Sequence, residues 1–365
     1  MKLGIIGLAR AGKTTVFNAV TRGTAQVGTY SSGTQPNMGV VMVPDERVDR
    51  LAEIYHPKKV TYATIQYVDF PAAGESFGKG EGPGGKFLNE LARLDGLIHV
   101  VRAFEDEAVP HPEVKVDAER DIATMDLELT FADAAQIEKR VARLDSEIRS
   151  MKAGEREGPQ RLRELLGRIK TGLEADTPVR AQTISEDEWR LLEGTQFLTA
   201  LPMLVLVNIG EEDLGRREDL EKTYRERFAG PNREVAVFAG KFEMDLNELD
   251  AEEAAEFREA AGVTESGMAN AIRLSYALLG QMSFLTAGPD ECRAWTVRMG
   301  ATAPEAAGKI HSDLQRGFIR AEVVRFEDMV AAGSEAEAKK RGALRTEGKQ
   351  YVVQDGDILN ILFNV

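Results

Sequence analysis

Apolar residues along this chain follow two alternating patterns: short continuous runs, and longer segments with helical spacing. The short runs predict buried strands. Over the first 280 residues they are KLGII (2–6), MGVVMV (38–43), YATIQYVDF (62–70), GLIHVVRAF (96–104), PMLVLVNI (202–209) and EVAVFAG (234–240). Segments with helical patterns separate these strands, and such alternation is typical of a doubly wound, mostly parallel sheet. The sequence therefore predicts an α/β fold.

A different pattern occupies residues 127–198. Apolar residues recur there at steps of four and three, first at Ile137, Val141, Leu144, Ile148 and Met151, and again after the breaker AGEREGP at Leu162, Leu166, Ile169 and Leu173. This spacing predicts a helical hairpin, an antiparallel coiled coil inserted into the sheet domain. Two interpretations of its arginines and lysines stay open. One is a binding surface, and the other is a solvated charged face, which the glutamates interspersed among them favour.

From residue 281 onward the chain changes again. RAWTVRMG, GFIRAEVVRF, YVVQDGD and ILNILFNV are short strand-like runs separated by glycine turns, with one helix signal, APEAAGKIHSDLQRG, between them. This composition predicts a small α+β domain. We therefore expect an α/β sheet domain at 1–126 and 199–280, a helical insert at 127–198, and a C-terminal domain at 281–365.

The stretch GLARAGKTT, residues 7–15, carries the P-loop pattern G-x-x-x-x-G-K-[ST] between a predicted strand and a predicted helix. Backbone N–H groups of such a loop and the positive end of the helix both point at phosphate oxygens. We expect Lys13 to face solvent and reach the β- and γ-phosphates, Thr14 to bind Mg²⁺, and Thr15 to contact the α-phosphate. The predicted phosphate-binding residues are Ala9, Arg10, Ala11, Gly12, Lys13, Thr14 and Thr15.

Asp69 ends the apolar run 62–70, the position that a Walker B carboxylate needs in order to reach Mg²⁺. An aspartate at a strand end is also common as a turn or helix-cap residue. The interpretation of Asp69 as a metal ligand therefore depends on the P-loop earlier in the sequence. Lys13 and Asp69 are the candidate catalytic residues, and Thr14, Thr34 and Asp69 the candidate Mg²⁺ ligands. The glycine-rich segment 71–86 follows directly and predicts a mobile loop that senses the γ-phosphate.

Composition narrows the class of protein. The 365 residues are 43% hydrophobic, carry a formal net charge of -14 and include one cysteine, Cys292, and no apolar stretch approaches the length of a membrane span. An acidic chain is a poor general nucleic-acid binder, so any such contact needs a local basic patch. With its first strand starting at Lys2, the chain is expected to be a cytoplasmic protein, a monomer without membrane or DNA partners.

Several stretches together resemble the Obg-like ATPase family, the YchF branch of P-loop NTPases. They are GEGPGGKF, GLIHVVRAFED, TESGMANAI, TAGPDECRAWTV, TAPEAAGKIHSDLQRGFIRAEVV, LRTEGKQYVVQDGDI and the terminal FNV. The resemblance implies that the insert is a coiled coil and that residues 281–365 form a β-grasp TGS domain. It further implies a switch that hydrolyses ATP, or GTP, with Mg²⁺ and binds the ribosome and its RNA.

The base-binding positions fit the same resemblance. Asn208, Ile209, Gly210 and Glu211 form N-x-x-E where GTPases carry N-K-x-D, and Ala239, Gly240 and Lys241 stand where the family has its second base-side loop. In N-K-x-D the aspartate accepts hydrogen bonds from two guanine donors that adenine lacks. The longer acid and the missing lysine weaken guanine selection, so we expect ATP to bind at least as tightly as GTP.

Two departures from the family concern the phosphate site. Ala9, Arg10 and Ala11 replace the family's Pro-Asn-Val, and Ala72 replaces the glycine of Asp-x-x-Gly. Pro71 and Ala72 restrict a backbone swing toward the γ-phosphate, and no glutamine follows to orient water. Two alternatives therefore stay open: a ribosome-associated scaffold that holds nucleotide with little hydrolysis, and a GTPase with an atypical base site.

Overall fold

The computed structural model describes residues 1–21, 36–70, 85–113, 115–263 and 265–364. They form two compact units, each with its own sheet. The first unit contains Met1–Gly39 and Gln66–Ala271, and the second contains Val40–Ile65 and Ile272–Val365. The sequence did not predict that residues 40–65 pack with the C-terminal part of the chain.

The first sheet is the predicted α/β sheet. Its strands are β1 (Lys2–Ile6), β2 (Asn37–Met42), β4 (Thr64–Asp69), β5 (Gly96–Ala103), β6 (Met203–Ile209) and β7 (Arg233–Phe238), in the order β2-β4-β1-β5-β6-β7. From β4 to β7 every neighbouring pair is parallel. After β1 the chain forms β2 and β4 on one side of that strand, and later β5, β6 and β7 on its other side. The strand order therefore reverses beside β1. In such sheets ligands bind at the carboxyl edge at this reversal.

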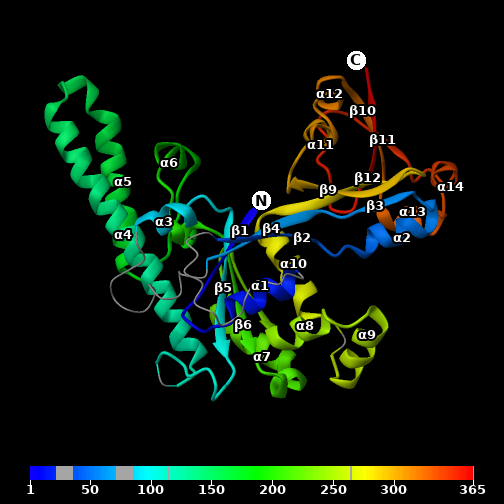
Figure 1. Cartoon of the computed structure of the whole chain (residues 1–365). Coiled ribbons are helices and arrows are strands. Elements are labelled where there is room, and N and C mark those ends of the chain that lie inside the picture. The colour runs from blue at the N-terminus through cyan, green and yellow to red at the C-terminus, as the bar shows by residue number, and fades with distance from the viewer. Residues whose placement is uncertain (22–35, 71–84, 114, 264, 365) are drawn as a thin grey trace. The chain divides into compact units, whose positions relative to one another are not determined.

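Helices pack against this sheet because their apolar faces match its buried strands (Figure 1). Besides the helical insert, the helices of the first unit are α1 (Lys13–Thr21), α3 (Gly85–Leu91), α7 (Arg217–Phe228), α8 (Gly240–Leu246) and α9 (Ala251–Ala260). The helix α10 (Gly267–Leu278) begins in the first unit and ends in the second, whose C-terminal part starts at Ile272. The sequence assigned residues 85 and 86 to the glycine-rich loop, but they begin α3. Glycine is tolerated there because it opens the helix and does not lie in its interior. The rest of that loop, 71–84, lies outside the described residues.

The predicted helical hairpin consists of α4 (Ala118–Ser150) and α5 (Glu157–Glu174), joined by the short turn η2 (Ala153–Glu155). The two helices run alongside one another (Figure 1) and share a core of Ile137, Leu144, Leu166, Ile169 and Leu173. These are residues of the four-and-three spacing, so burial of that stripe explains the packing. The expected boundary at residue 127 falls inside α4; a coiled-coil supercoil stays a prediction.

Two short 3-10 helices, η3 (Val179–Ala181) and η4 (Leu198–Ala200), together with α6 (Glu186–Leu191), lead from the hairpin back to the sheet. The buried Asp133 of α4 ties this return to the helix. Its two carboxylate oxygens accept hydrogen bonds from the backbone N–H groups of Leu198 and Thr199, both at 2.8 Å, and from the Thr199 hydroxyl at 2.7 Å. The Asp133 carboxylate thus satisfies two backbone donors at the start of η4.

The second sheet has the order β11-β10-β12-β8-β9-β3 and is mixed. Its strands are β3 (Lys59–Thr61), β8 (Gln281–Thr286), β9 (Glu291–Arg298), β10 (Phe318–Val324), β11 (Arg345–Glu347) and β12 (Ile358–Phe363). The helices of this unit are α2 (Glu46–Tyr55), α11 (Ala303–Ile310), α12 (Ser312–Arg316), α13 (Phe326–Ala332) and α14 (Glu335–Lys340). The predicted α+β character of the C-terminal part is present.

The run 62–70 forms one strand, β4, which is shorter than predicted at both ends. Two other local predictions were wrong. The single helix signal 303–317 is two helices, because His311 is extended and its Nδ1 accepts a hydrogen bond from the Asp313 backbone N–H at 3.2 Å, which starts α12. The run YVVQDGD lies outside the named strands and contributes one isolated bridge, Thr302 with Val352.

None of the helices among the described residues is both long enough and apolar enough to span a bilayer.

Candidate functional site

The P-loop connects β1 to α1 through residues 7–12, at the carboxyl edge of the first sheet. Three of its residues have positive φ: Gly7 (152°), Arg10 (62°) and Gly12 (90°). A Cβ at Gly7 would lie 2.3 Å from the Val100 carbonyl oxygen, and one at Gly12 would lie 2.4 Å from the Asn208 amide nitrogen. Both glycines are therefore required by backbone angle and by space.

Lys13, the first residue of α1, points back across the loop. Its Nζ donates hydrogen bonds to the carbonyl oxygens of Gly7 at 3.1 Å and Leu8 at 2.9 Å. The residue is 7% exposed, so the expectation that it faces solvent was wrong. Burial lowers the pKa of Lys13 to about 8, although the charge of Asp69 acts in the opposite direction. A phosphate in the loop would supply the counter-charge that the buried ammonium needs.

Asp69 ends β4 and is fully buried beside the start of α1. Its Oδ2 accepts hydrogen bonds from the Thr14 hydroxyl at 3.1 Å and from the Asn37 amide at 3.4 Å. The other oxygen, Oδ1, is buried and has no hydrogen-bond partner within the described part of the chain. Burial is the main reason that the pKa of Asp69 is raised.

A hydroxyl and a buried carboxylate with one unsatisfied oxygen fit a Mg²⁺ ion. Mg²⁺ in such sites takes one or two protein oxygens and completes its shell with water and phosphate oxygens. Thr14 and Asp69 supply donors of that kind, 3.1 Å apart. Thr34, the third predicted ligand, lies outside the described residues.

Asn208, at the end of β6, joins the P-loop to the loop after β7. Its Nδ2 donates to the Ala11 carbonyl oxygen at 3.2 Å, and its Oδ1 accepts from the Gly240 backbone N–H at 2.9 Å. The side chain is 3% exposed. Both ends of the amide are thus used within the protein, and Asn208 fixes the two loops relative to one another.

The other predicted base-side residues differ in exposure. The Ile209 side chain is buried in the core of the first unit, so only its backbone is available to a ligand. Ala239 and Gly240 are buried, whereas Glu211 and Lys241 are exposed. The structure therefore brings the P-loop, Asp69, Asn208 and the 239–240 turn together at one edge of the sheet.

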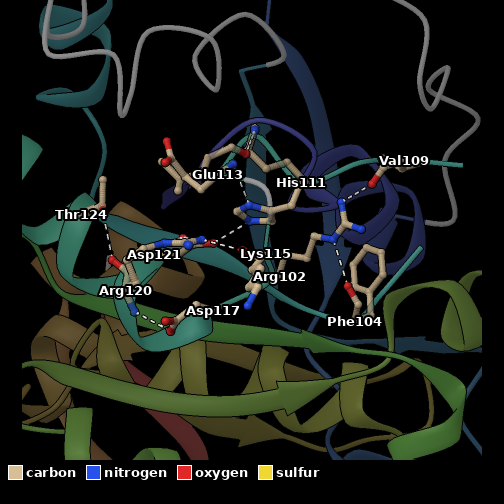
Figure 2. A network of polar contacts seen from close by, with 12 residues as sticks. Arg102, Phe104, Val109, His111, Glu113, Lys115, Asp117, Arg120, Asp121 and Thr124 are labelled. Atoms are coloured by element: carbon tan, nitrogen blue, oxygen red, sulfur yellow. Dashed lines mark hydrogen bonds and ion pairs between the residues drawn. The ribbon is translucent and has the colours of Figure 1, made fainter. Parts of the chain in front are cut away.

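A polar network at the same edge went unrecognised in the sequence (Figure 2). Arg102, near the end of β5, is 1% exposed; its Nε donates to the Phe104 carbonyl oxygen at 3.0 Å and its Nη1 to that of Val109 at 2.7 Å. Burial lowers the pKa of Arg102. A charged residue inside the apolar run GLIHVVRAF was the available signal, because a buried guanidinium needs acceptors nearby.

His111 is the second centre of this network. Its Nδ1 accepts a hydrogen bond from the Glu113 backbone N–H at 3.1 Å, so the proton resides on Nε2, which donates to Asp121 Oδ2 at 2.9 Å. The Arg120 guanidinium donates to the other oxygen of Asp121 at 2.8 and 3.0 Å. Asp121 lies in the first turn of α4, so the segment after β5 is fastened to the start of the hairpin.

Comparison with known proteins places this geometry in a family. A family model described as "50S ribosome-binding GTPase" matches residues 2–146, and the model YchF-GTPase_C, described as "Protein of unknown function (DUF933)", matches residues 281–364. The first match contains the P-loop and Asp69, and the second begins at the predicted C-terminal boundary.

Similarity to individual proteins extends over the whole chain. The "Ribosome-binding ATPase YchF" of Bacillus subtilis is 41% identical over 365 residues, covering 99% of each chain, and the human "Obg-like ATPase 1" is 37% identical over 374 residues, covering 100% of this chain and 92% of the other. The solved structure of the Schizosaccharomyces pombe YchF GTPase superposes with a TM-score of 0.83 at 31% identity, covering 99% of this chain and 97% of that one. The chain therefore belongs to the YchF family of Obg-like ATPases.

Proposed function

We propose that this protein hydrolyses ATP at the P-loop and acts as a ribosome-associated switch in the cytoplasm. The observation that carries the proposal is the arrangement of Lys13, Thr14 and Asp69 at the phosphate-binding loop. Relatives named ribosome-binding ATPases, similar over the full chain, support the partner and the compartment.

Hydrolysis of a phosphoanhydride needs little covalent chemistry from a protein, so positioning and charge neutralisation carry the reaction. Lys13 and the backbone N–H groups of the P-loop would neutralise the β- and γ-phosphate oxygens. Thr14 and Asp69 would hold Mg²⁺, with Thr34 as the third ligand, and the ion when bound neutralises charge on the phosphates. Asp69 would also keep the Thr14 hydroxyl turned toward the ion.

The preference for ATP rests on the N-x-x-E sequence. Because the Asn208 amide is engaged by Ala11 and Gly240, direct reading of the base falls to Glu211 and the backbone. Glu211 is exposed at the start of η5 (Glu211–Arg216). We expect Glu211→Asp to move the preference only partly toward GTP, since Ile209 still stands where GTPases have lysine.

A GTPase activity is the second candidate, because the model matching residues 2–146 and the fission-yeast structure both carry that name. Calorimetric titration of the full chain with MgATP and MgGTP separates the two. We expect ATP to bind at least as tightly as GTP. Strong preference for GTP would assign the second activity. Measured phosphate release separates both from a scaffold that binds nucleotide with little turnover.

We propose that the hairpin and the C-terminal domain make the ribosome contact. Several hairpin cations are already paired: Arg163 with Asp145, Lys170 with Glu138, and Arg168 with Glu188. These pairs belong to a solvated charged face. Arg161 on α5 and Arg320 on β10 are exposed and are our candidates for contact with RNA phosphates.

Co-sedimentation with ribosomes tests this contact. Deletion of residues 281–365 is unsuitable, because β3 pairs with β9 and residues 40–65 would lose their packing. Arg161→Glu and Arg320→Glu are better variants in the full chain. We expect weaker pelleting for both, steep loss with added salt, and a difference between an ATP analogue and ADP. Equal pelleting of parent and variants in every nucleotide state would refute this assignment.

A further inference from the structure

Arg10 occupies the middle of the P-loop and makes a contact that leaves the phosphate site. Its backbone is in the left-handed region, with φ 62°, and its side chain is exposed. Its Nη1 donates a hydrogen bond to the Pro110 carbonyl oxygen at 2.8 Å. A residue in this conformation within a phosphate-binding loop turns its backbone N–H toward the anion. Backbone and side chain of Arg10 therefore serve two different parts of the molecule.

Pro110 belongs to residues 104–113, a segment anchored from the sheet as well. Arg102 donates to the carbonyl oxygens of Phe104 and Val109, and its guanidinium carbon lies 4.6 Å from the centre of the Phe104 ring. Because Arg102 is buried in the strand, this anchor is independent of the P-loop. The carbonyl groups of two successive residues, 109 and 110, thus accept from arginines of two different elements.

The far end of the segment is fastened to α4 (Figure 2). His111, next to Pro110, donates to Asp121 in the first turn of the helix, and Asp117 caps that turn by accepting from the Arg120 backbone N–H at 3.0 Å. Two hydrogen bonds, joined by the peptide link between residues 110 and 111, therefore connect the P-loop residue Arg10 to the helix that carries the hairpin.

We propose that Arg10 is a positioning residue that couples phosphate occupancy of the P-loop to residues 104–113 and the first turn of α4. The inference rests on the proposed function, since a bound phosphate must fix the P-loop backbone. A phosphate that holds the Arg10 backbone also holds its side chain against Pro110. By linkage, the segment in turn favours the phosphate-bound P-loop.

Hydrogen–deuterium exchange of residues 104–113 in the full chain tests the coupling, with and without a non-hydrolysable MgATP analogue. In the parent protein we expect the nucleotide to slow exchange there about fivefold, the effect of one hydrogen bond of ordinary net strength. Arg10→Asn should lose this protection, because asparagine tolerates the left-handed backbone but does not reach Pro110. Arg10→Lys, which keeps a cationic donor, should retain part of it. Arg93→Asn, at an exposed arginine before β5, should behave like the parent.

Calorimetry on the same samples distinguishes the possible failures. Absence of nucleotide binding by the parent would refute the proposed function, and the coupling with it. Normal binding with no nucleotide-dependent protection at 104–113 would overturn the coupling alone. Protection in Arg10→Asn equal to that of the parent would overturn the role of Arg10. Loss of protection in Arg10→Asn together with a nucleotide affinity about fivefold weaker, the reciprocal effect of the lost coupling, is the result that we expect.

Discussion

Replacement of Asn208 by alanine should disrupt the nucleotide site without touching the P-loop sequence. The amide bridges the Ala11 carbonyl oxygen and the Gly240 N–H, and both of those residues are buried. Alanine removes the two hydrogen bonds and leaves one donor and one acceptor without partners. Since the amide nitrogen also limits the space above Gly12, the loop loses the contact that defines its position.

The expected cost follows from those two groups. A buried polar group left without a partner costs about 1 to 3 kcal/mol. Relaxation of the loops toward water lowers this for at least one of them, so we expect the first unit to lose about 2 to 4 kcal/mol of unfolding free energy. Nucleotide affinity should fall as well, because the P-loop and the 239–240 turn no longer hold a fixed distance.

Urea unfolding and calorimetric titration with MgATP measure the two effects. Asn247→Ala is the matched control: that amide makes one hydrogen bond, to the Ala19 carbonyl oxygen at 2.8 Å, and is half-buried. It should cost about 1 kcal/mol and leave nucleotide affinity unchanged. If Asn208→Ala were no more destabilising than the control and bound MgATP like the parent, the bridging role of Asn208 would be refuted.

Two further predictions concern buried carboxylates. Asp69→Asn should abolish Mg²⁺-dependent phosphate release without lowering unfolding free energy, because it removes a buried charge with an unsatisfied oxygen; a clear loss of stability with intact Mg²⁺ dependence would contradict this. Burial raises the pKa of Asp133 from 3.8 to about 6. At pH values between these two pKa values, the folded chain keeps a proton on Asp133 that the unfolded chain has lost, so the unfolding free energy falls as the pH rises through this range. Relative to Asp133→Asn, the parent should lose up to about 3 kcal/mol between pH 4 and pH 7, measured by urea unfolding, and a pH-independent difference would contradict the shift.

The strands and the P-loop were predictable because each depends on local sequence. Apolar runs of strand length identify β1, β5 and β6, and the glycine spacing identifies the loop. The short β3 was missed, since three largely exposed residues carry no apolar pattern and pair with a strand more than 230 positions later. The membership of residues 40–65 in the second unit depends on such distant contacts, among them the β3–β9 pairing and the ion pair of Arg47 with Asp355.

Within the site, residue identity was easier to predict than environment. Asn208 was predicted as a base-binding residue. Its hydrogen-bond partners, Ala11 and Gly240, come from two other loops, so its side chain connects those loops. Lys13 was expected in solvent because lysine usually is, whereas the loop folds over it. The Arg102 and His111 network depends on carbonyl groups and on Asp121, whose approach no spacing rule reveals.

Binding and hydrolysis of MgATP by the full-length parent and by Lys13→Ala test the central claim most directly. The claim is that residues 7–14 hold the phosphates of a nucleotide. We expect the parent to bind MgATP and release phosphate, and the variant to lose about a hundredfold in affinity or more, on the order of a charge-assisted contact in a buried site. Circular dichroism must show that both are folded. Equal binding and equal phosphate release by the two folded proteins would contradict the assignment of the P-loop as the nucleotide site.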